Sequence, residues 1–428
     1  MSDDPTVGLT VTRRQILGVS LGNALEFYDF LVFSFFAVQI GQCFFPATDP
    51  NSSLLLALAT FGAGFLTRPI GAVVIGGLGD RIGRRPMMLL SFAMVGASTL
   101  GVALTPPYAA IGMAAPVIVV LCRMVQGFAL GGEVGTSTAF LAEVAPAPKR
   151  GLYVSLQYAG QGASTLLAGV IGVGLAATMS EAALASWGWR IAMGLGAATV
   201  PVGLMLRRTL PETLHPEASK IRPPVIGSYA RVAIFAFLTL LSSTITNYVL
   251  NYMTTFAKGT LGMAAGVSLG ATAVIGLANL TGSLLAGLLS DRHGRLPWMT
   301  WPMVLGAIAV MPGFWLLTTW PSATTLYAVS FVLRFVLAIA ATSAFIAVVE
   351  ALPARIRSGA LSVIYALAIS IFGGSTQFVV TWLIRVTGNP LAPAWYMFVA
   401  ALLGVVALIF AKETATVSRP HGVDRLDC

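Results

Sequence analysis

The chain has 428 residues, of which 57% are hydrophobic and 10% charged, and its mean hydropathy is +0.85. Soluble domains carry about 25% charged residues, so this composition excludes a water-soluble fold. The net charge of +9 would suit a nucleic-acid partner, but the basic residues occupy short segments between apolar runs, which excludes that class.

Apolar runs follow one another along the whole chain, and most approach the roughly 20 residues that a helix needs to cross a bilayer. The first six predicted spans cover residues 16–40, 54–78, 86–105, 112–143, 151–178 and 187–206. The second six cover residues 231–257, 263–289, 298–318, 323–350, 358–385 and 391–411. The first run carries Glu26 and Asp29 and no small-residue cleavage site, so we expect a retained span and not a signal peptide. These runs predict an all-α integral membrane protein of twelve transmembrane helices.

The Lys and Arg residues are distributed unequally between the two sides of these spans. Nineteen of the 25 fall in segments on the side of the N-terminus, and three, Arg190, Lys258 and Arg385, fall on the other side. The remaining three, Arg68, Arg123 and Arg334, fall inside spans. By the positive-inside rule, both termini are predicted to be cytoplasmic.

The chain divides into two similar halves. Gly76, Asp80, Arg81, Gly83 and Arg84 recur 211 positions later as Gly287, Asp291, Arg292, Gly294 and Arg295. We therefore predict a six-helix bundle over residues 1–206, a proline-rich cytoplasmic linker over 207–230, a second six-helix bundle over 231–411 and a cytoplasmic tail over 412–428. Repeats of this kind place the substrate site between the halves, near the middle of the membrane.

Several motifs resemble one transporter family. The segment GGLGDRIGRR from Gly76 resembles the loop between spans two and three of the major facilitator superfamily. The stretches GNALEFYDF from Gly22, FGAGFLTRPIGA from Phe61, RMVQGFALGGE from Arg123 and WGWRI from Trp187 resemble its metabolite/proton symporter branch. Within that branch, YALAISIFGGST from Tyr365 and TGNPLAPAWYM from Thr387 look most like citrate and tricarballylate symporters.

The resemblance implies a secondary active transporter of a bacterial inner membrane that imports a small carboxylate with protons by alternating access. A symporter of another metabolite, such as 2-oxoglutarate, shikimate, proline or betaine, is the neighbouring alternative. A drug/proton antiporter of the same fold is a further one, although buried arginines such as Arg334 and Arg123 count against it. The expected partners are the anionic substrate, protons and lipid, with a single chain as the working unit.

Ionisable residues at membrane depth are the candidates for proton coupling, because such groups are costly there unless they serve transport. Asp29 and Arg123 are predicted to lie at similar depth, so the Asp29 carboxylate could alternate between pairing with Arg123 and protonation. A permanent ion pair that only joins two helices is the alternative. Glu26 shares a helix face with Asp29 and is the second proton candidate, or else a gating hydrogen-bond partner. Arg68 is expected nearer the cytoplasmic side, paired with Glu133.

Arg334 is the leading candidate for the substrate, because no carboxylate in the second half is expected at its depth and a bound carboxylate could supply the counter-charge. Pairing with Asp29 or Glu26 across the cavity is the alternative. Polar residues on one face of their helices are predicted to help, or instead to hydrogen-bond between helices: Asn247, Asn251 and Tyr252 in span seven, Gln157 and Gln161 in span five, Tyr365 in span eleven, and Arg123.

Charged residues at the cytoplasmic helix ends are predicted to form gating networks. These are Asp80, Arg81 and Arg84 in the first half, Asp291, Arg292 and Arg295 in the second, and Glu143 with Arg150 and Glu350 with Arg357 beside them. No phosphate-binding loop, metal-ligand spacing or catalytic constellation is recognisable, so we expect no cofactor, no metal and no enzymatic activity.

Overall fold

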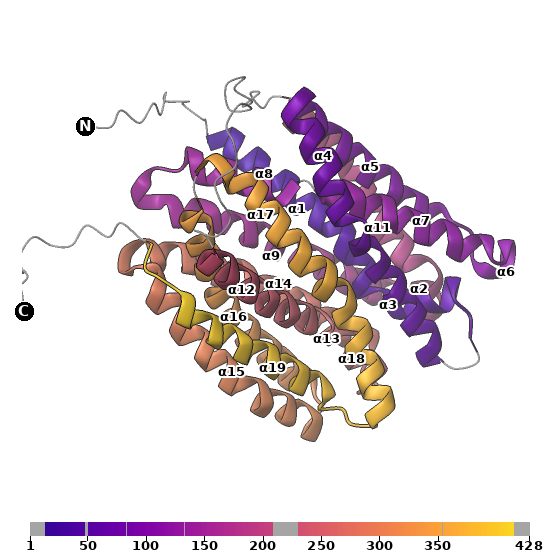
Figure 1. Ribbon diagram of the computed structural model, residues 1–428. Coiled ribbons are helices and arrows are strands. Elements are labelled where there is room, and N and C mark those ends of the chain that lie inside the picture. The colour runs from indigo at the N-terminus through magenta and orange to yellow at the C-terminus, as the bar shows by residue number, and fades with distance from the viewer. Residues whose placement is uncertain are drawn as a thin grey trace, which may run out of the picture.

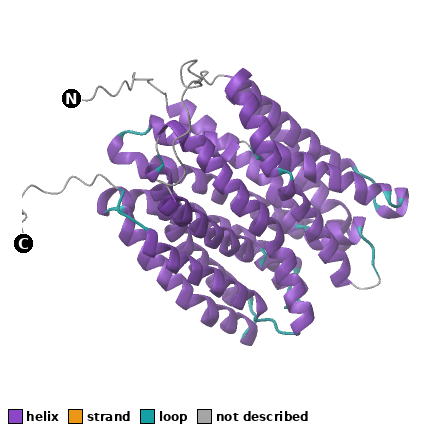
Figure 2. Cartoon of the chain, in the orientation of Figure 1, coloured by secondary structure: helices purple, strands orange, loops and turns teal. Residues whose placement is uncertain are grey.

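The computed structural model describes residues 13–47, 50–82, 84–131, 133–208, 230–352 and 354–414 (Figure 1). Within these ranges the secondary structure is helical throughout, with short connecting loops and no strand (Figure 2). Some side chains inside the helices lie outside the described part, and among the residues singled out above these are Glu26, Asp29, Asp80, Arg81, Arg84, Glu133 and Arg357.

Helices occupy each of the first six predicted ranges. They are α1 (Arg13–Phe35), α2 (Ala37–Phe44), α3 (Pro50–Leu66), α4 (Arg68–Ile82), α5 (Arg84–Leu104), α6 (Tyr108–Ile111), α7 (Ala114–Leu130), α8 (Glu133–Val144), α9 (Arg150–Thr178), α10 (Glu181–Ala183) and α11 (Trp189–Arg208). The second range is divided at Thr67, because Pro69 lacks a backbone N–H and cannot continue the helical ladder. The fourth is divided at Gly131, a residue that weakens a helix.

The later ranges are helical as well. They contain α12 (Ala230–Asn251), α13 (Met253–Gly259), α14 (Ala265–His293), α15 (Arg295–Thr319), α16 (Ala323–Ala351), α17 (Ala354–Ala368), α18 (Gly374–Thr387) and α19 (Ala392–Ala407). A π-helical turn, Ile369–Gly373, joins α17 to α18. Gly294 separates α14 from α15 with a φ of 92°, which glycine adopts without the steric cost that a side chain would bring.

Eight segments of the described chain are long and apolar enough to cross a membrane. They are Ser52–Ile75, Ala147–Thr178, Arg231–Gly259, Ala265–His293, Arg295–Thr319, Ala323–Ala351, Gly359–Thr387 and Ala392–Phe410. The predicted spans one, three, four and six are helical but fall short of this criterion. The apolar helices of spans three and four, Leu89–Leu104 and Ala114–Leu130, are shorter, and span one contains two carboxylates.

The helices before residue 209 pack largely on one another, as do those after residue 229, and the most extensive contacts between the two sets join three helix pairs. These pairs are α9 with α14, α3 with α18, and α8 with α17 (Figure 1). Glycines make the α9–α14 contact close: a Cβ on Gly162 would overlap the backbone of Leu280, and one on Gly276 would overlap that of Leu166. Small residues of this kind let helix backbones approach in the apolar environment of a bilayer.

The bundle has two ends, which we name by a residue at each. The Asp291 end is where α14 ends and α9, α12 and α15 begin. The Arg190 end is where α5 ends and α11 begins. The middle between them holds a large aromatic core, in which Phe30, Phe61 and Phe65 have ring centroids 4.9 to 5.2 Å apart.

Candidate functional site

A polar cavity lies where the two sets of helices meet. Its lining comes from α1, α9, α12, α14, α17 and the π-helical turn, and its polar members are Tyr158, Gln161, Thr165, Ser243, Thr244, Asn247, Tyr248, Asn251, Asn279 and Tyr365. The open space is about 30 Å³, enough for one or two water molecules. The cavity is therefore nearly closed in this conformation, with amides, hydroxyls and phenols around it.

Hydrogen bonds hold part of this lining and leave other groups free to bind. Asn279 Nδ2 donates to the Tyr158 carbonyl at 3.1 Å, which links α14 to α9. Asn251 Nδ2 donates to Asn247 Oδ1 at 3.5 Å along α12. Gln161 Nε2 and Ser243 Oγ are buried with no hydrogen-bond partner among the described residues. An amide donor left unpaired in the cavity wall is costly unless a ligand or water accepts from it.

Two arginines lie together on one side of this region. The Arg68 guanidinium is 4.5 Å from the Phe30 ring centroid and 4.3 Å from that of Phe65, and the Arg123 guanidinium is 4.4 Å from Phe30. Such cation–π contacts offset part of the cost of burying a cation. Arg123 also donates to Gln126 Oε1, and Gln126 donates to Thr99 Oγ1 at 3.0 Å. Nε and Nη2 of both arginines have no hydrogen-bond partner among the described residues.

Arg68 and Arg123 meet at one ring. Both guanidinium groups contact Phe30, while the backbone of Arg68 packs against Gly131 and that of Arg123 packs against Gly64. The pairing of Arg68 near the cytoplasmic side stays a prediction. The side chain of Glu133, the predicted partner of Arg68, lies outside the described part.

Tyrosines separate these arginines from the cavity. Tyr248 and Tyr365 line the cavity and lie close enough to Arg68 for electrostatic interaction. The Tyr248 ring packs edge-on against Phe65 at 5.5 Å. The cavity wall on this side is therefore phenolic, with two positive charges behind it.

Arg334 has a similar place near another tyrosine of the cavity wall. It lies on α16, is 5% exposed, and its Nε has no partner among the described residues. Tyr158, which lines the cavity, lies within electrostatic range of its guanidinium, and the Tyr158 ring packs against Phe345 at 5.1 Å. Arg334 itself is not among the described residues of the cavity wall. Arg334 is thus a buried cation in the layer behind a tyrosine.

The predicted binding residues divide into those that meet at the cavity and those that do not. Asn247, Asn251, Gln161 and Tyr365 line it together. Three others do not face it, namely Tyr252, whose hydroxyl accepts from Thr381 Oγ1 at 2.9 Å, Gln157, whose Oε1 accepts from Ser137 Oγ at 3.4 Å, and Arg123, described above. For Gln157 the observed bond is the helix-to-helix alternative.

Sequence reasoning missed Asn279. Its side chain is 2% exposed within the apolar run of α14. An amide is unusual in such a run, so this contrast alone could have identified Asn279 as a candidate. Tyr158 was a weaker candidate among the polar residues of the spans, and Tyr248, next to Asn247, was given no binding role. Both need the fold to be placed, because nothing in their spacing separates the cavity face from the core face.

The proton candidates Glu26 and Asp29 have their backbone in α1, but their side chains lie outside the described part of the chain. The neighbouring Phe30 ring contacts Arg68 and Arg123, and Phe27 and Leu31 line the cavity. The turn of α1 that carries both carboxyl groups therefore lies between two buried cations and the cavity. Their roles in coupling stay predictions.

A network of charges closes the Asp291 end. Asp291 accepts hydrogen bonds from the backbone N–H groups of Gly151 and Leu152, at 2.8 and 2.9 Å, so a residue of α14 caps the N-terminus of α9. Arg295 bridges Asp291 at 2.8 Å and Glu350 at 2.9 Å. The network joins the two sets of helices, since α9 belongs to the first and α14 to the second.

The C-terminal segment after α19 reinforces this network. Glu413 accepts from the backbone N–H groups of Arg295 and Leu296, both at 2.9 Å, and Thr414 Oγ1 donates to Glu350 Oε2 at 2.8 Å. Arg295 also binds Glu350, and the predicted pairing of Glu350 with Arg357, whose side chain lies outside the described part, stays a prediction.

The other predicted gating residues have varied positions. Arg292 is exposed to solvent, as is Glu143, while Arg150 is half-buried at the start of α9. The side chains of Asp80, Arg81 and Arg84 lie outside the described residues, so the first-half copy of the network stays a prediction.

Comparison with known proteins adds to this geometry. Residues 19–374 match the model of the family described as Major Facilitator Superfamily. A citrate-proton symporter of Salmonella typhi is 34% identical over 410 residues, covering 94% of each chain. An alpha-ketoglutarate permease of Escherichia coli (strain K12) is 34% identical over 412 residues, covering 93% of each. A glycine betaine/proline/ectoine/pipecolic acid transporter of Dickeya dadantii is 33% identical over 428 residues, covering 94% of this chain and 84% of its own.

A solved structure has the same fold. The proton:xylose symporter XylE, bound to 6-bromo-6-deoxy-D-glucose, superposes with a TM-score of 0.76 at 20% identity, over 94% of this chain and 96% of its own. At this identity the likeness concerns the arrangement of helices and not the ligand.

Proposed function

The chain belongs to the Major Facilitator Superfamily, and we propose that it imports a small di- or tricarboxylate, such as citrate or tricarballylate, together with protons. It is a multi-pass membrane transporter of the bacterial inner-membrane kind and not an enzyme. The observation that carries the substrate class is the polar cavity between the two sets of helices, with buried arginines near its tyrosines.

The chemistry of the cavity suits a carboxylate. Amide N–H groups and phenolic hydroxyls donate hydrogen bonds to carboxylate oxygens, and Gln161 Nε2 is an unpaired donor in the wall. Arg68 and Arg334 behind the wall supply positive potential in a low-dielectric interior, where it acts strongly on a bound anion. A substrate with two or three carboxylates can be attracted by both cations at once.

The transport cycle follows from the two sets of helices. We propose twelve membrane spans with both termini in the cytoplasm, two six-helix bundles over 1–206 and 231–411 joined by the linker 207–230, and a tail over 412–428. Rocking of the bundles along the glycine contacts of α9 and α14 would open the cavity to one side at a time. In this cycle the Asp291 network holds the cytoplasmic side closed, and a single chain suffices.

Proton coupling is assigned to α1. We propose that Asp29, or Glu26 on the same face, takes up a proton when the cavity opens outward and releases it when the cavity opens inward. Arg123 lies in the same bundle and favours the ionised form of a neighbouring carboxyl group, and a carboxyl side chain that turns from Arg123 toward the cavity would favour protonation. This switch would link the substrate gradient to the proton gradient.

One uptake experiment separates the candidate substrates. Radiolabelled citrate, tricarballylate, 2-oxoglutarate, shikimate and proline are offered to proteoliposomes with and without an inward proton gradient. Accumulation of citrate or tricarballylate that requires the gradient supports the proposal. Selective accumulation of proline would instead favour the osmolyte alternative, to which the relative from Dickeya dadantii belongs by its name. Uptake of none of the acids would contradict the carboxylate assignment.

A further inference from the structure

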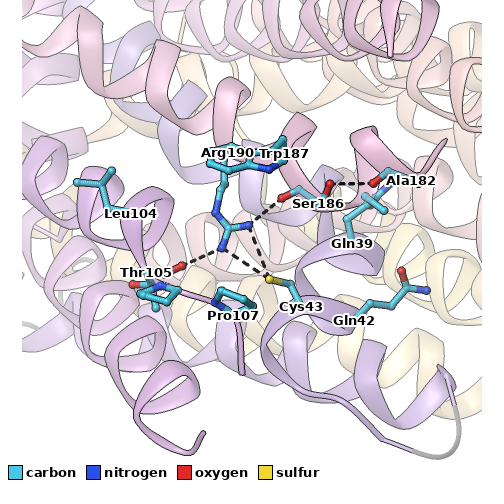
Figure 3. Close-up of a pocket in the computed structure, with 12 residues that line it drawn as sticks. Gln39, Gln42, Cys43, Leu104, Thr105, Pro107, Ala182, Ser186, Trp187 and Arg190 are labelled. Atoms are coloured by element: carbon cyan, nitrogen blue, oxygen red, sulfur yellow. Dashed lines mark hydrogen bonds between the residues drawn. The ribbon is translucent and has the colours of Figure 1, made fainter. Parts of the chain in front are cut away.

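A second hollow lies at the Arg190 end, away from the central cavity (Figure 3). It is a cleft of about 480 Å³ between α2, the loop that follows α5, and the π-helical turn Leu184–Gly188. Gln39, Gln42, Cys43, Thr105, Trp187 and Arg190 form its polar and aromatic lining. Clefts of this size are typical of small-molecule sites.

Arg190 is held in this cleft by bonds that fix its position. Nη1 donates to the Ser186 carbonyl and Nη2 to the Thr105 carbonyl, each at 2.8 Å, and the guanidinium lies 4.1 Å from the ring centroid of the buried Trp189. Both Nη atoms also approach Cys43 Sγ, at 3.7 Å each. Figure 3 shows the thiol in the fork between them.

The fork of Arg190 is therefore paired with a poor acceptor. A thiol sulfur accepts hydrogen bonds only weakly, whereas a carboxylate or phosphate accepts two parallel N–H bonds from an arginine. Cys43 is only half-buried, so an oxyanion that enters the cleft can reach the two Nη atoms over the thiol and cover it. The exposed Gln42 amide stands at the edge of the same cleft and can donate to the anion as well.

Basic side chains line the hollows of this end. Two of the three basic residues predicted on this side, Arg190 and Lys258, do so, and Glu181, which lies within electrostatic range of Lys258, is in the wall of neither hollow. Gln39 belongs to both, because it also lines the small cavity that contains Lys258 between α2 and α13. The cleft thus adjoins the boundary between the two sets of helices, which a substrate must pass on its way to the central cavity.

We propose that the cleft is a second oxyanion site, in which Arg190 binds a carboxylate of the substrate before it enters the central cavity. The inference rests on the proposed function for the source of the anion. The phosphate of a lipid headgroup has the same chemistry, and the exposed Trp187 is of the type that lies at the membrane–water interface, where headgroups are found. The two sources are separated by the experiment.

The test measures how fast Cys43 reacts with a neutral maleimide in nanodiscs of phosphatidylcholine, in a Cys122→Ser, Cys428→Ser background. An oxyanion in the fork covers the thiol, so citrate or tricarballylate should slow the reaction saturably. Phosphatidylglycerol nanodiscs without citrate form the second arm, and slowing only there assigns the site to lipid phosphate. An unchanged rate in both arms overturns the proposal.

Variants show whether the slowing comes from this cleft. Arg190→Gln should abolish it, and Arg190→Lys should keep only part, since a lysine lacks the fork. Gln42→Glu leaves the bonds of Arg190 intact and should weaken the effect of citrate about fivefold by like-charge repulsion. Thr319→Glu, an equal charge on the exposed end of α15, should leave it unchanged.

The labelling rate of Cys43 can be measured whether or not the protein transports citrate. Slowing by citrate must persist in Arg334→Ala, because loss of the effect there would mean that the central cavity controls Cys43 through a conformational change, and the proposal would be overturned. Citrate that slows labelling but is never accumulated would contradict the transport function and leave the oxyanion site standing. Accumulation of citrate without any slowing of Cys43 labelling would support the transport function and overturn the oxyanion site.

Discussion

Asp291→Asn should shift the carrier toward conformations that are open at the Asp291 end. The Asp291 carboxylate is shared between Arg295, which lies on the same side of the boundary, and the N–H groups of Gly151 and Leu152, which lie across it. Opening of this end breaks the contacts to α9 and keeps the one to Arg295. Only the contacts that differ between the two states change the equilibrium.

The size of the shift follows from these two hydrogen bonds. A hydrogen bond to a charged group contributes about 1.5–3 kcal/mol, and asparagine retains one acceptor oxygen without the charge that favours a helix N-terminus. We therefore expect a loss of about 2 kcal/mol, a change of about 30-fold in the equilibrium. A population of about 1% open would rise to about 25%.

Spin labels at the exposed Lys149 and Lys412, on opposite sides of the boundary at this end, report the change as a distance distribution. Asp291→Asn should add a long-distance component in a background without native cysteines. Arg292→Gln is the matched control, because Arg292 is exposed one residue away. A distance distribution identical to that of the parent, or an equal shift in Arg292→Gln, would show that the Asp291 contacts to α9 do not hold this end closed.

Three more substitutions test other parts of the account. Arg334→Ala should weaken citrate binding by roughly 30-fold or more, with partial recovery in Arg334→Lys, and unchanged affinity by calorimetry would remove this residue from the site. Gly162→Leu should cost at least about 1–3 kcal/mol through overlap with α14, measured as a lower thermal midpoint in detergent, with the uncrowded Gly174→Leu as control. Asp29→Asn should keep citrate counterflow but lose gradient-driven accumulation, and normal accumulation would make Asp29 structural.

Much of the fold could be predicted because apolar length and Gly/Pro punctuation are local properties of the sequence. The predicted ranges are all helical, and the family follows from motifs such as GGLGDRIGRR. The interruptions at Phe36 and Tyr252 could not be predicted, because no glycine or proline marks them and tertiary packing decides where such helices bend. The interruption at Thr67 had a local signal in Pro69.

The site was predicted less completely, because a polar residue in a span has two possible uses. Asn251 and Gln161 line the cavity, whereas Gln157, one turn from Gln161, bonds to Ser137 between helices. Sequence spacing places both amides on one face and cannot give the rotation of α9 relative to α14. The cavity also depends on pairs such as Asn279 with Tyr158, which are 121 positions apart and meet only in the folded chain.

The coupling of carboxylate to proton is tested most directly by a pH indicator trapped inside proteoliposomes that hold no initial gradient. Citrate added outside should enter and acidify the interior at the same time, as symport requires, and the acidification should be absent from liposomes without the protein and suppressed in Asp29→Asn. Entry of citrate at a normal rate with no acidification would contradict proton symport.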